Sequence, residues 1–303
     1  MEENKEMNEG LFKVRSYLGC LSEGIKLPTR NFIPLLKFLY PTLVVSALFT
    51  VGAFLFAWNA QEITTNKKLI VLLFQAVSLL PGCLSFGQLS VAVSHYNATS
   101  TLEGLHPWAL RKEILGAFGR SALAFYALFF IFIIYNIIIG LLLYVLIPNV
   151  LLLMLLGIVL FPAVFILAVM VPYQMTACDY MLDGKQGFLK SLARMKDGYR
   201  NWGAFFIVPL CGGFLSGLVA LVGSLPFFIL INVKFLARQA TMIGDATDLP
   251  AMFPVMLGVT GLIALLFILI ASWFVFFPTS YLYGSVEACK KERERFEAEG
   301  QEQ

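Results

Sequence analysis

Charged side chains are scarce in this chain. Asp, Glu, Lys and Arg make up 14% of its 303 residues, whereas a soluble domain carries about 25%. Hydrophobic residues reach 59%, and the mean hydropathy is +0.80. A water-soluble core cannot bury that much apolar surface, so lipid must be part of the solvent. The net charge of +3 and the lack of a basic tract with interleaved aromatic residues argue against nucleic acid as a partner.

Histidine and paired cysteine are also nearly missing. His95 and His106 have no second ligand at metal-binding spacing, and the five cysteines stand alone. The sequence contains no CxxC, HExxH, nucleophile-elbow or phosphate-loop motif. We therefore expect no metal, no cofactor and no catalytic residue.

Three aspartates cluster near the middle of the chain: Asp179, Asp183 and Asp197. A metal-dependent enzyme of phospholipid synthesis needs a motif such as D-x2-D-G-x2-A-R. Here three residues separate Asp179 from Asp183, and eight separate Gly184 from Ala193. Carboxylates at the wrong spacing cannot converge on one metal. We interpret Asp183 as a helix N-cap and Asp197 as a solvated partner of nearby basic residues.

What the chain does have is long apolar runs, each able to span a bilayer core of about 20 residues. Such runs must be helical, because lipid cannot satisfy free backbone groups. None of them contains Asp, Glu, Lys or Arg, and only Pro148 and Asn149 separate the third from the fourth, which predicts a tight hairpin. The six predicted spans are 41–58, 69–94, 121–147, 150–172, 204–233 and 254–283.

Basic residues are distributed unevenly between the two sides of these spans. Six lie in 1–40, three in 111–120, five in 185–200 and four in 290–295, so eighteen of the 22 share one side. The positive-inside rule places both termini in the cytoplasm. The prediction is an all-α polytopic protein, 1–303 being one membrane domain. It comprises a cytoplasmic amphipathic segment (1–40), a six-helix bundle (41–283) and a charged cytoplasmic tail (284–303).

The segment before the fifth span predicts an amphipathic helix on the cytoplasmic face. Apolar residues recur at helical spacing, as Phe188, Leu192, Met195, Tyr199 and Trp202. The same pattern recurs as Leu11, Val14, Leu18, Leu21 and Ile25, and more weakly in 106–121 with Trp108. We expect these helices to lie in the membrane interface. The residues predicted to contact lipid headgroups or a partner are Lys185, Lys190, Arg194, Lys196, Arg200, Trp202 and Trp108.

Three tandem units of two spans each are a further hypothesis, at about 16–97, 98–180 and 181–288. Basic residues precede the odd spans at Lys37, Arg120 and Arg200, and tyrosine-containing exits follow the even ones. Any six-helix protein with both ends inside shows some such pattern, which is the competing interpretation. Within "GGFLSG", Gly213 and Gly217 are four residues apart, which predicts close helix packing within the bundle or between subunits.

Residues 170–210 resemble part of a loose group of uncharacterised bacterial six-helix membrane proteins. That group includes the membrane domain attached to some glycerophosphodiester phosphodiesterases. The resemblance rests on Pro172, Gly187, Leu189, Ser191 and Trp202, over about forty residues. The resemblance implies a helical bundle of unknown activity in a bacterial cytoplasmic (inner) membrane, and the chain has no room for a phosphodiesterase domain.

Two functions follow as hypotheses, with an enzyme as a third. The first is a non-enzymatic scaffold or accessory subunit that acts through membrane lipids or a protein partner at the cytoplasmic face. The alternative is a transport subunit, passive or driven by an ATPase, or a lipid-handling protein. The lack of an ionisable residue in the spans argues against a coupled carrier. A polar cavity lined by Gln88, Asn136 and Gln174 would favour transport, and an oligomer is compatible with either function.

Overall fold

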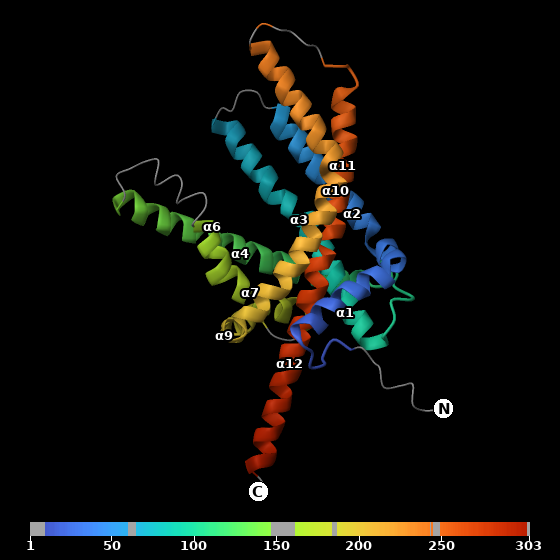
Figure 1. Cartoon of the computed structure of the whole chain (residues 1–303), viewed down its shortest axis with the longest axis vertical. Helices are drawn as coiled ribbons and strands as arrows, with labels where there is room; N and C mark the ends of the chain where they lie inside the picture. The colour runs from blue at the N-terminus through green and yellow to red at the C-terminus, as the bar shows by residue number, and fades with distance from the viewer. Residues whose placement is uncertain are drawn as a thin grey trace.

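The computed structural model describes residues 10–59, 65–146, 161–183, 187–242, 244 and 249–301. Within these ranges the chain is helical and has no strand (Figure 1). The first half contains α1 (Tyr17–Arg30), α2 (Phe32–Asn59), α3 (Thr65–Thr99) and α4 (Arg111–Leu146). The second half contains α6 (Phe161–Phe165), the π-helix η2 (Ile166–Met170), α7 (Val171–Cys178), the π-helix η3 (Asp179–Asp183), α8 (Phe188–Ala193), α9 (Met195–Arg200), α10 (Trp202–Met242), α11 (Phe253–Ala271) and α12 (Trp273–Gln301).

Five segments of the described chain are long and apolar enough to cross a membrane, which confirms an all-α, multi-pass membrane class. They are Phe32–Phe49, Arg111–Leu141, Pro162–Leu182, Trp202–Thr241 and Phe253–Glu299. The predicted second span, 69–94, falls within the long helix α3. The predicted hairpin at Pro148 and Asn149 lies outside the described residues.

The helices do not form one parallel bundle (Figure 1). α10 and α11 pack side by side, α2 packs on α3 and α11, and α4 leads away from them with α6. α12 runs back past α10, α7 and α1 and projects beyond the other elements. The hydrophobic core lies where these helices cross, and its largest fully buried side chains include Trp273, Tyr283, Phe38, Phe205 and Phe277.

The stretch 254–283, predicted as one helix, is divided at Ser272 into α11 and α12. Pro278 lies inside α12; it has no amide hydrogen for the carbonyl of Phe274, so one hydrogen bond of the helix is missing there while the helix continues. Just before this point the chain makes a tighter turn, because the amide of Val275 donates to the carbonyl of Ser272, three residues earlier, at 3.1 Å.

Two of the three expected interfacial helices form separate elements. α1 buries Cys20, Gly24 and Leu27 on the side that packs against α12, whereas Leu18 of the predicted apolar stripe is 78% exposed. The third expectation is wrong, because 111–120 is the first part of the continuous helix α4 and not a helix of its own. Nothing in 111–121 interrupts the helical ladder, so it continues directly into the span.

The short helices α1 and α9 end in the same way. Asn31 ends α1 and Asn201 ends α9, with φ and ψ of −111° and 32° against −107° and 26°. Each asparagine donates its side-chain amide to the carbonyl four residues earlier, at 3.1 Å and 3.0 Å. An arginine precedes and an aromatic residue follows each one, at Arg30 and Phe32 and at Arg200 and Trp202.

Gly213 and Gly217 do not pack helices together within the described part of the chain. A Cβ built on either glycine meets nothing within 4 Å. Gly212 makes the contact instead, because a Cβ there would collide with the carbonyl oxygen of Phe274 on α12. The GGFLSG motif predicted a close approach, but only the structure assigns it to one glycine. Packing of Gly213 and Gly217 between subunits stays a prediction.

We expect Gly212→Leu to lower the free energy of unfolding by about 1–3 kcal/mol, because overpacking forces the backbones of α10 and α12 apart. Gly213→Leu adds the same bulk to open space and should change it little. Denaturant unfolding in detergent checks both variants. Equal destabilisation by the two would contradict this assignment of the contact.

Candidate functional site

The candidate site is built on a break in the helical ladder before Pro172. Proline has no amide hydrogen, so the carbonyl of Ala168 loses its α-helical donor, and that of Leu167 loses the donor a π-helix would supply. η2 occupies this position, between α6 and α7. Tyr199 donates its hydroxyl to the carbonyl of Ala168 at 2.6 Å, and Trp202 donates Nε1–H to that of Leu167 at 2.7 Å. Two side chains from the next helices therefore satisfy the freed carbonyls.

Gly198 allows α9 to reach this break. A Cβ on Gly198 would collide with the backbone of Pro172. Together with the bonds from Tyr199 and Trp202, this contact makes part of the predicted apolar stripe a protein-packing surface. Trp202 was predicted to contact headgroups; it is half-buried and also stacks on Phe206 at 5.1 Å between ring centroids.

The predicted helix over 184–202 forms two short helices, α8 and α9, joined at Arg194. The prediction of Asp183 as its N-cap is wrong, because Gly187 is the N-cap of α8 and Asp183 ends η3. Gly187 has extended backbone angles, and no side chain caps this end.

Arg194 is turned into the protein, so the prediction that it contacts headgroups or a partner is wrong. Its Nη1 lies 3.2 Å from Asp179 Oδ1, and its Nε lies 3.1 Å from Asp197 Oδ2. Its Nη2 pairs with Glu287 of α12. The side chain of Asp179 is only 2% exposed, so its charge must be compensated inside the protein. One guanidinium thus joins η3, α9 and α12.

Two further contacts complete this Arg194 cluster, which comprises Asp179, Arg194, Asp197, Tyr283, Glu287 and Lys290. Tyr283 donates its hydroxyl to Asp179 Oδ1 at 3.1 Å, and Lys290 Nζ lies 3.3 Å from Asp197 Oδ2. Asp197 is therefore a partner of basic residues, as expected. The sequence did not predict that Arg194 pairs with both Asp179 and Glu287. One feature of the sequence could have indicated it: Asp179 is a carboxylate at the end of an apolar helix, and such a charge needs a partner.

The other predicted contact residues remain on the surface where the structure describes them. Lys190, Lys196 and Arg200 are exposed, and Trp108 is 85% exposed in the turn before α4. Lys185 lies outside the described residues. The four exposed side chains are free to meet a lipid surface or a partner, and contact with either stays a prediction.

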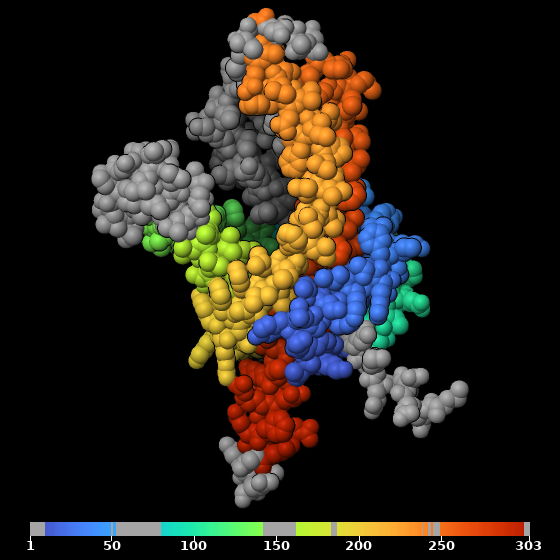
Figure 2. All heavy atoms as spheres, in the orientation of Figure 1, coloured from blue at the N-terminus to red at the C-terminus, as the bar shows by residue number. Residues whose placement is uncertain are grey.

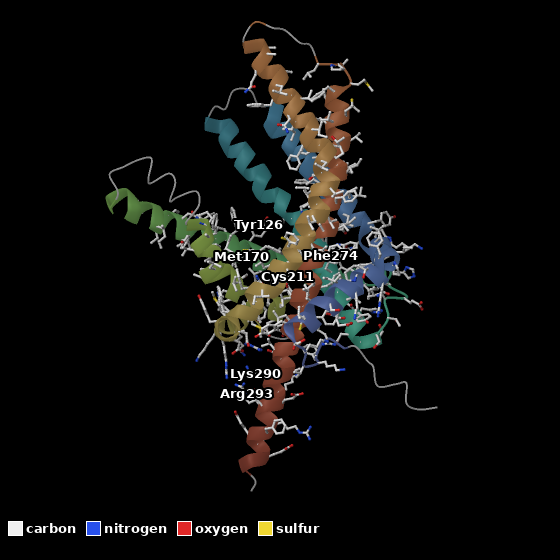
Figure 3. The ribbon with its side chains drawn as sticks, viewed as in Figure 1. Tyr126, Met170, Cys211, Phe274, Lys290 and Arg293 are labelled. Atoms are coloured by element: carbon white, nitrogen blue, oxygen red, sulfur yellow. The ribbon has the colours of Figure 1, made fainter. Side chains whose placement is uncertain are left out.

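Next to the cluster lies an apolar cavity of about 400 Å³ between α3, α4, α7, α10 and α12. Met170, labelled in Figure 3, is one of its lining residues. Gln174 lines it, but Gln88 and Asn136 do not. Asn136 donates to the carbonyl of Phe132 on its own helix at 2.7 Å, and Gln88 is buried elsewhere. The three amides that would have made a polar cavity therefore do not converge.

A second, polar cavity of about 570 Å³ adjoins the cluster, and two members of the cluster line it. Arg15, Arg200, Lys290 and Arg293 line it together with Asp197, Glu294 and Glu297. Figure 3 labels Lys290 and Arg293 on the projecting part of α12. Within the described residues, no group of three or more His, Cys, Asp or Glu side chains could hold a metal ion.

No protein-family model, curated protein or solved structure matches the chain. The similarity of residues 170–210 to bacterial six-helix membrane proteins therefore stays a prediction. The geometry of the cluster and the cavities is the basis for the function proposed below.

We expect Arg194→Met to lower the free energy of unfolding by about 3–5 kcal/mol, because it leaves the buried carboxylate of Asp179 unpaired. Lys196→Met, on the exposed side of the same helix, should change it by less than about 0.5 kcal/mol. Unfolding titrations in mixed micelles would measure both. Indistinguishable curves for the two variants would show that the ion pairs do not hold this region together.

Proposed function

We propose that the chain is a non-enzymatic scaffold or accessory subunit that presents α12 to a protein partner. The observation that carries this proposal is the continuity of α12. It begins among buried residues such as Trp273 and Phe277 and runs unbroken to Gln301, where Phe296 is 70% exposed. Figures 1 and 2 show its C-terminal part projecting beyond the rest of the molecule.

Several contacts hold α12 where it leaves the bundle. Glu287 and Lys290 pair with Arg194 and Asp197. On the other side, the amide of Arg15 donates to Ser285 Oγ at 2.9 Å, and that hydroxyl donates to the carbonyl of Arg15 at 3.1 Å. A helix held in this way presents its end in a fixed direction, which lowers the entropic cost of binding.

The proposed setting is a bacterial cytoplasmic membrane, with six spans and both termini in the cytoplasm. α3 would supply the sixth span. Membrane lipids would then be the second kind of partner. Each exposed lysine or arginine near an anionic leaflet contributes about 1 kcal/mol, and Lys190, Lys196 and Arg200 are placed for this role.

We also infer an internal repeat from matching contacts. Gly24 of α1 packs against Pro278, as Gly198 of α9 packs against Pro172. Gly87 of α3 packs against Phe118, near the start of α4, in the same close manner. In each case the segment before one span contacts the exit of another pair of spans. The equivalent of Arg200 in this arrangement is Arg30, whereas the spacing of basic residues had suggested Lys37.

The second candidate function is lipid handling. The cavity at Gln174 favours it, because the lining is almost entirely apolar and suits a lipid better than a polar solute. Oligomerisation through Gly213 and Gly217 is compatible with both functions.

Site-specific photocrosslinking in cells tests the partner. A benzoylphenylalanine at Phe296 should give one discrete protein adduct, because this ring is exposed on the projecting helix. The same group at Leu141, an exposed residue of a span, should meet lipid and give none. Truncation after Lys291 should lower recovery of the partner by at least about tenfold, on the scale of a lost hot spot.

Charge reversal of Arg111 and Lys112 is the matched control, since both are exposed at the start of α4, away from α12. This variant should retain the partner. The absence of any adduct at Phe296, or equal recovery with and without the tail, would reject the scaffold proposal.

Cysteine labelling tests the orientation. Cys289 is exposed beside the polar cavity, so a membrane-impermeant maleimide should modify it from the cytoplasmic side only. Cys20 should stay unmodified at neutral pH, because burial raises the pKa of its thiol and only the thiolate reacts. Cys289→Ser should remove the signal. Modification of Cys289 from the outside would reverse the proposed topology.

A further inference from the structure

The apolar cavity of about 400 Å³ has a size typical of ligand sites, which run from about 300 to 1,000 Å³. Its lining comes from segments of spanning length, including Phe125 of α4, Met170 before α7 and Ser216 of α10. Because these segments lie in lipid, acyl chains and not water are the surrounding solvent. The most abundant apolar ligand available to the cavity is therefore membrane phospholipid.

Two polar side chains that line the cavity have no hydrogen-bond partner in the described part of the chain. Neither the amide of Gln174 on α7 nor the hydroxyl of Ser216 on α10 makes a hydrogen bond there, and Gln174 Oε1 is buried. By contrast, Ser272 and Thr279 are satisfied, since they donate to the carbonyls of Leu269 and Val275. The Nε2–H groups of Gln174 and the hydroxyl of Ser216 can therefore donate to an acceptor inside the cavity, whereas Gln174 Oε1 can only accept.

The depth and charge of the cavity define that acceptor. Gln174 precedes Asp179 of the Arg194 cluster by five residues, about 7.5 Å of helix rise. The ester groups of a phospholipid lie just inside its charged headgroups, at a comparable depth. Among the described residues that line the cavity none is charged, so a neutral ester fits this position better than the carboxylate of a free fatty acid.

We propose that the cavity binds one acyl chain of a membrane phospholipid, with the ester carbonyl accepting hydrogen bonds from Gln174 and Ser216. This site is independent of partner binding by α12. It makes the lipid a bound component of the fold, distinct from the lipid that coats the outside of the spans.

A photoreactive phospholipid tests the site. The full-length protein is reconstituted in vesicles of phosphatidylethanolamine and phosphatidylglycerol that contain a phosphatidylethanolamine with a diazirine at the middle of one acyl chain. Labelled peptides are mapped by mass spectrometry. The expected result is labelling of 170–181 that saturates with probe concentration, whereas labelling of outward-facing residues such as Phe214 rises linearly.

Filling the cavity should abolish the saturable signal. Ser216→Phe and Ala177→Phe add bulk from facing walls and should each reduce it at least tenfold. Gly217→Leu adds bulk next to Ser216 but outside the cavity lining, and should leave it unchanged. Gln174→Leu keeps the cavity apolar but removes an ester donor, and should lower occupancy severalfold.

The wild-type result decides the proposal even where a filling variant fails to fold, which a melting curve would reveal. Labelling of 170–181 that never saturates would overturn it. So would filling variants that fold normally and keep the signal. An excess of free fatty acid that displaces the probe, where added unlabelled phospholipid does not, would overturn the assignment to a phospholipid.

Discussion

The missing amide hydrogen of Pro172 is the constraint on which the packing of α9, α10 and the Arg194 cluster depends. It leaves backbone carbonyls of Leu167 and Ala168 without helical donors inside an apolar segment, where an unsatisfied polar group is costly. Trp202 and Tyr199 supply the donors, and Gly198 lets α9 come close enough for them to do so. With α9 packed in this position, Arg194 lies next to Asp179 and also pairs with Glu287 of α12.

Pro278 acts in a comparable way in the last span. The carbonyl of Phe274 loses its donor there and lies against Gly212, while Gly24 of α1 packs on the proline itself. Each proline is thus paired with a glycine of a short helix, Gly24 or Gly198, at a place where a larger residue could not fit. At each proline, the distorted part of the spanning helix therefore makes a tertiary contact with another helix.

The sequence predicted the helical class and the presence of several segments able to span a membrane, because apolar runs without charge depend only on composition and length. It located the helices of α1 and α8–α9, whose stripes follow local spacing. It could not locate the partners of Arg194, since Asp179 and Glu287 are 15 and 93 residues away. Nor could it choose between Gly212 and Gly213, because that choice depends on how α10 is rotated against α12.

α12 also connects the apolar cavity with the polar one. Val275 and Thr279 line the apolar cavity, and Lys290 and Arg293, on nearly the same stripe of the helix, line the polar one. The flexible point that Pro278 would introduce between them is clamped by Gly24. The helix therefore has the form of a lever, whose short arm lines the apolar cavity and whose long arm is the projecting C-terminal part. Any change of tilt at the short arm is delivered at Gln301, enlarged by the length of the helix.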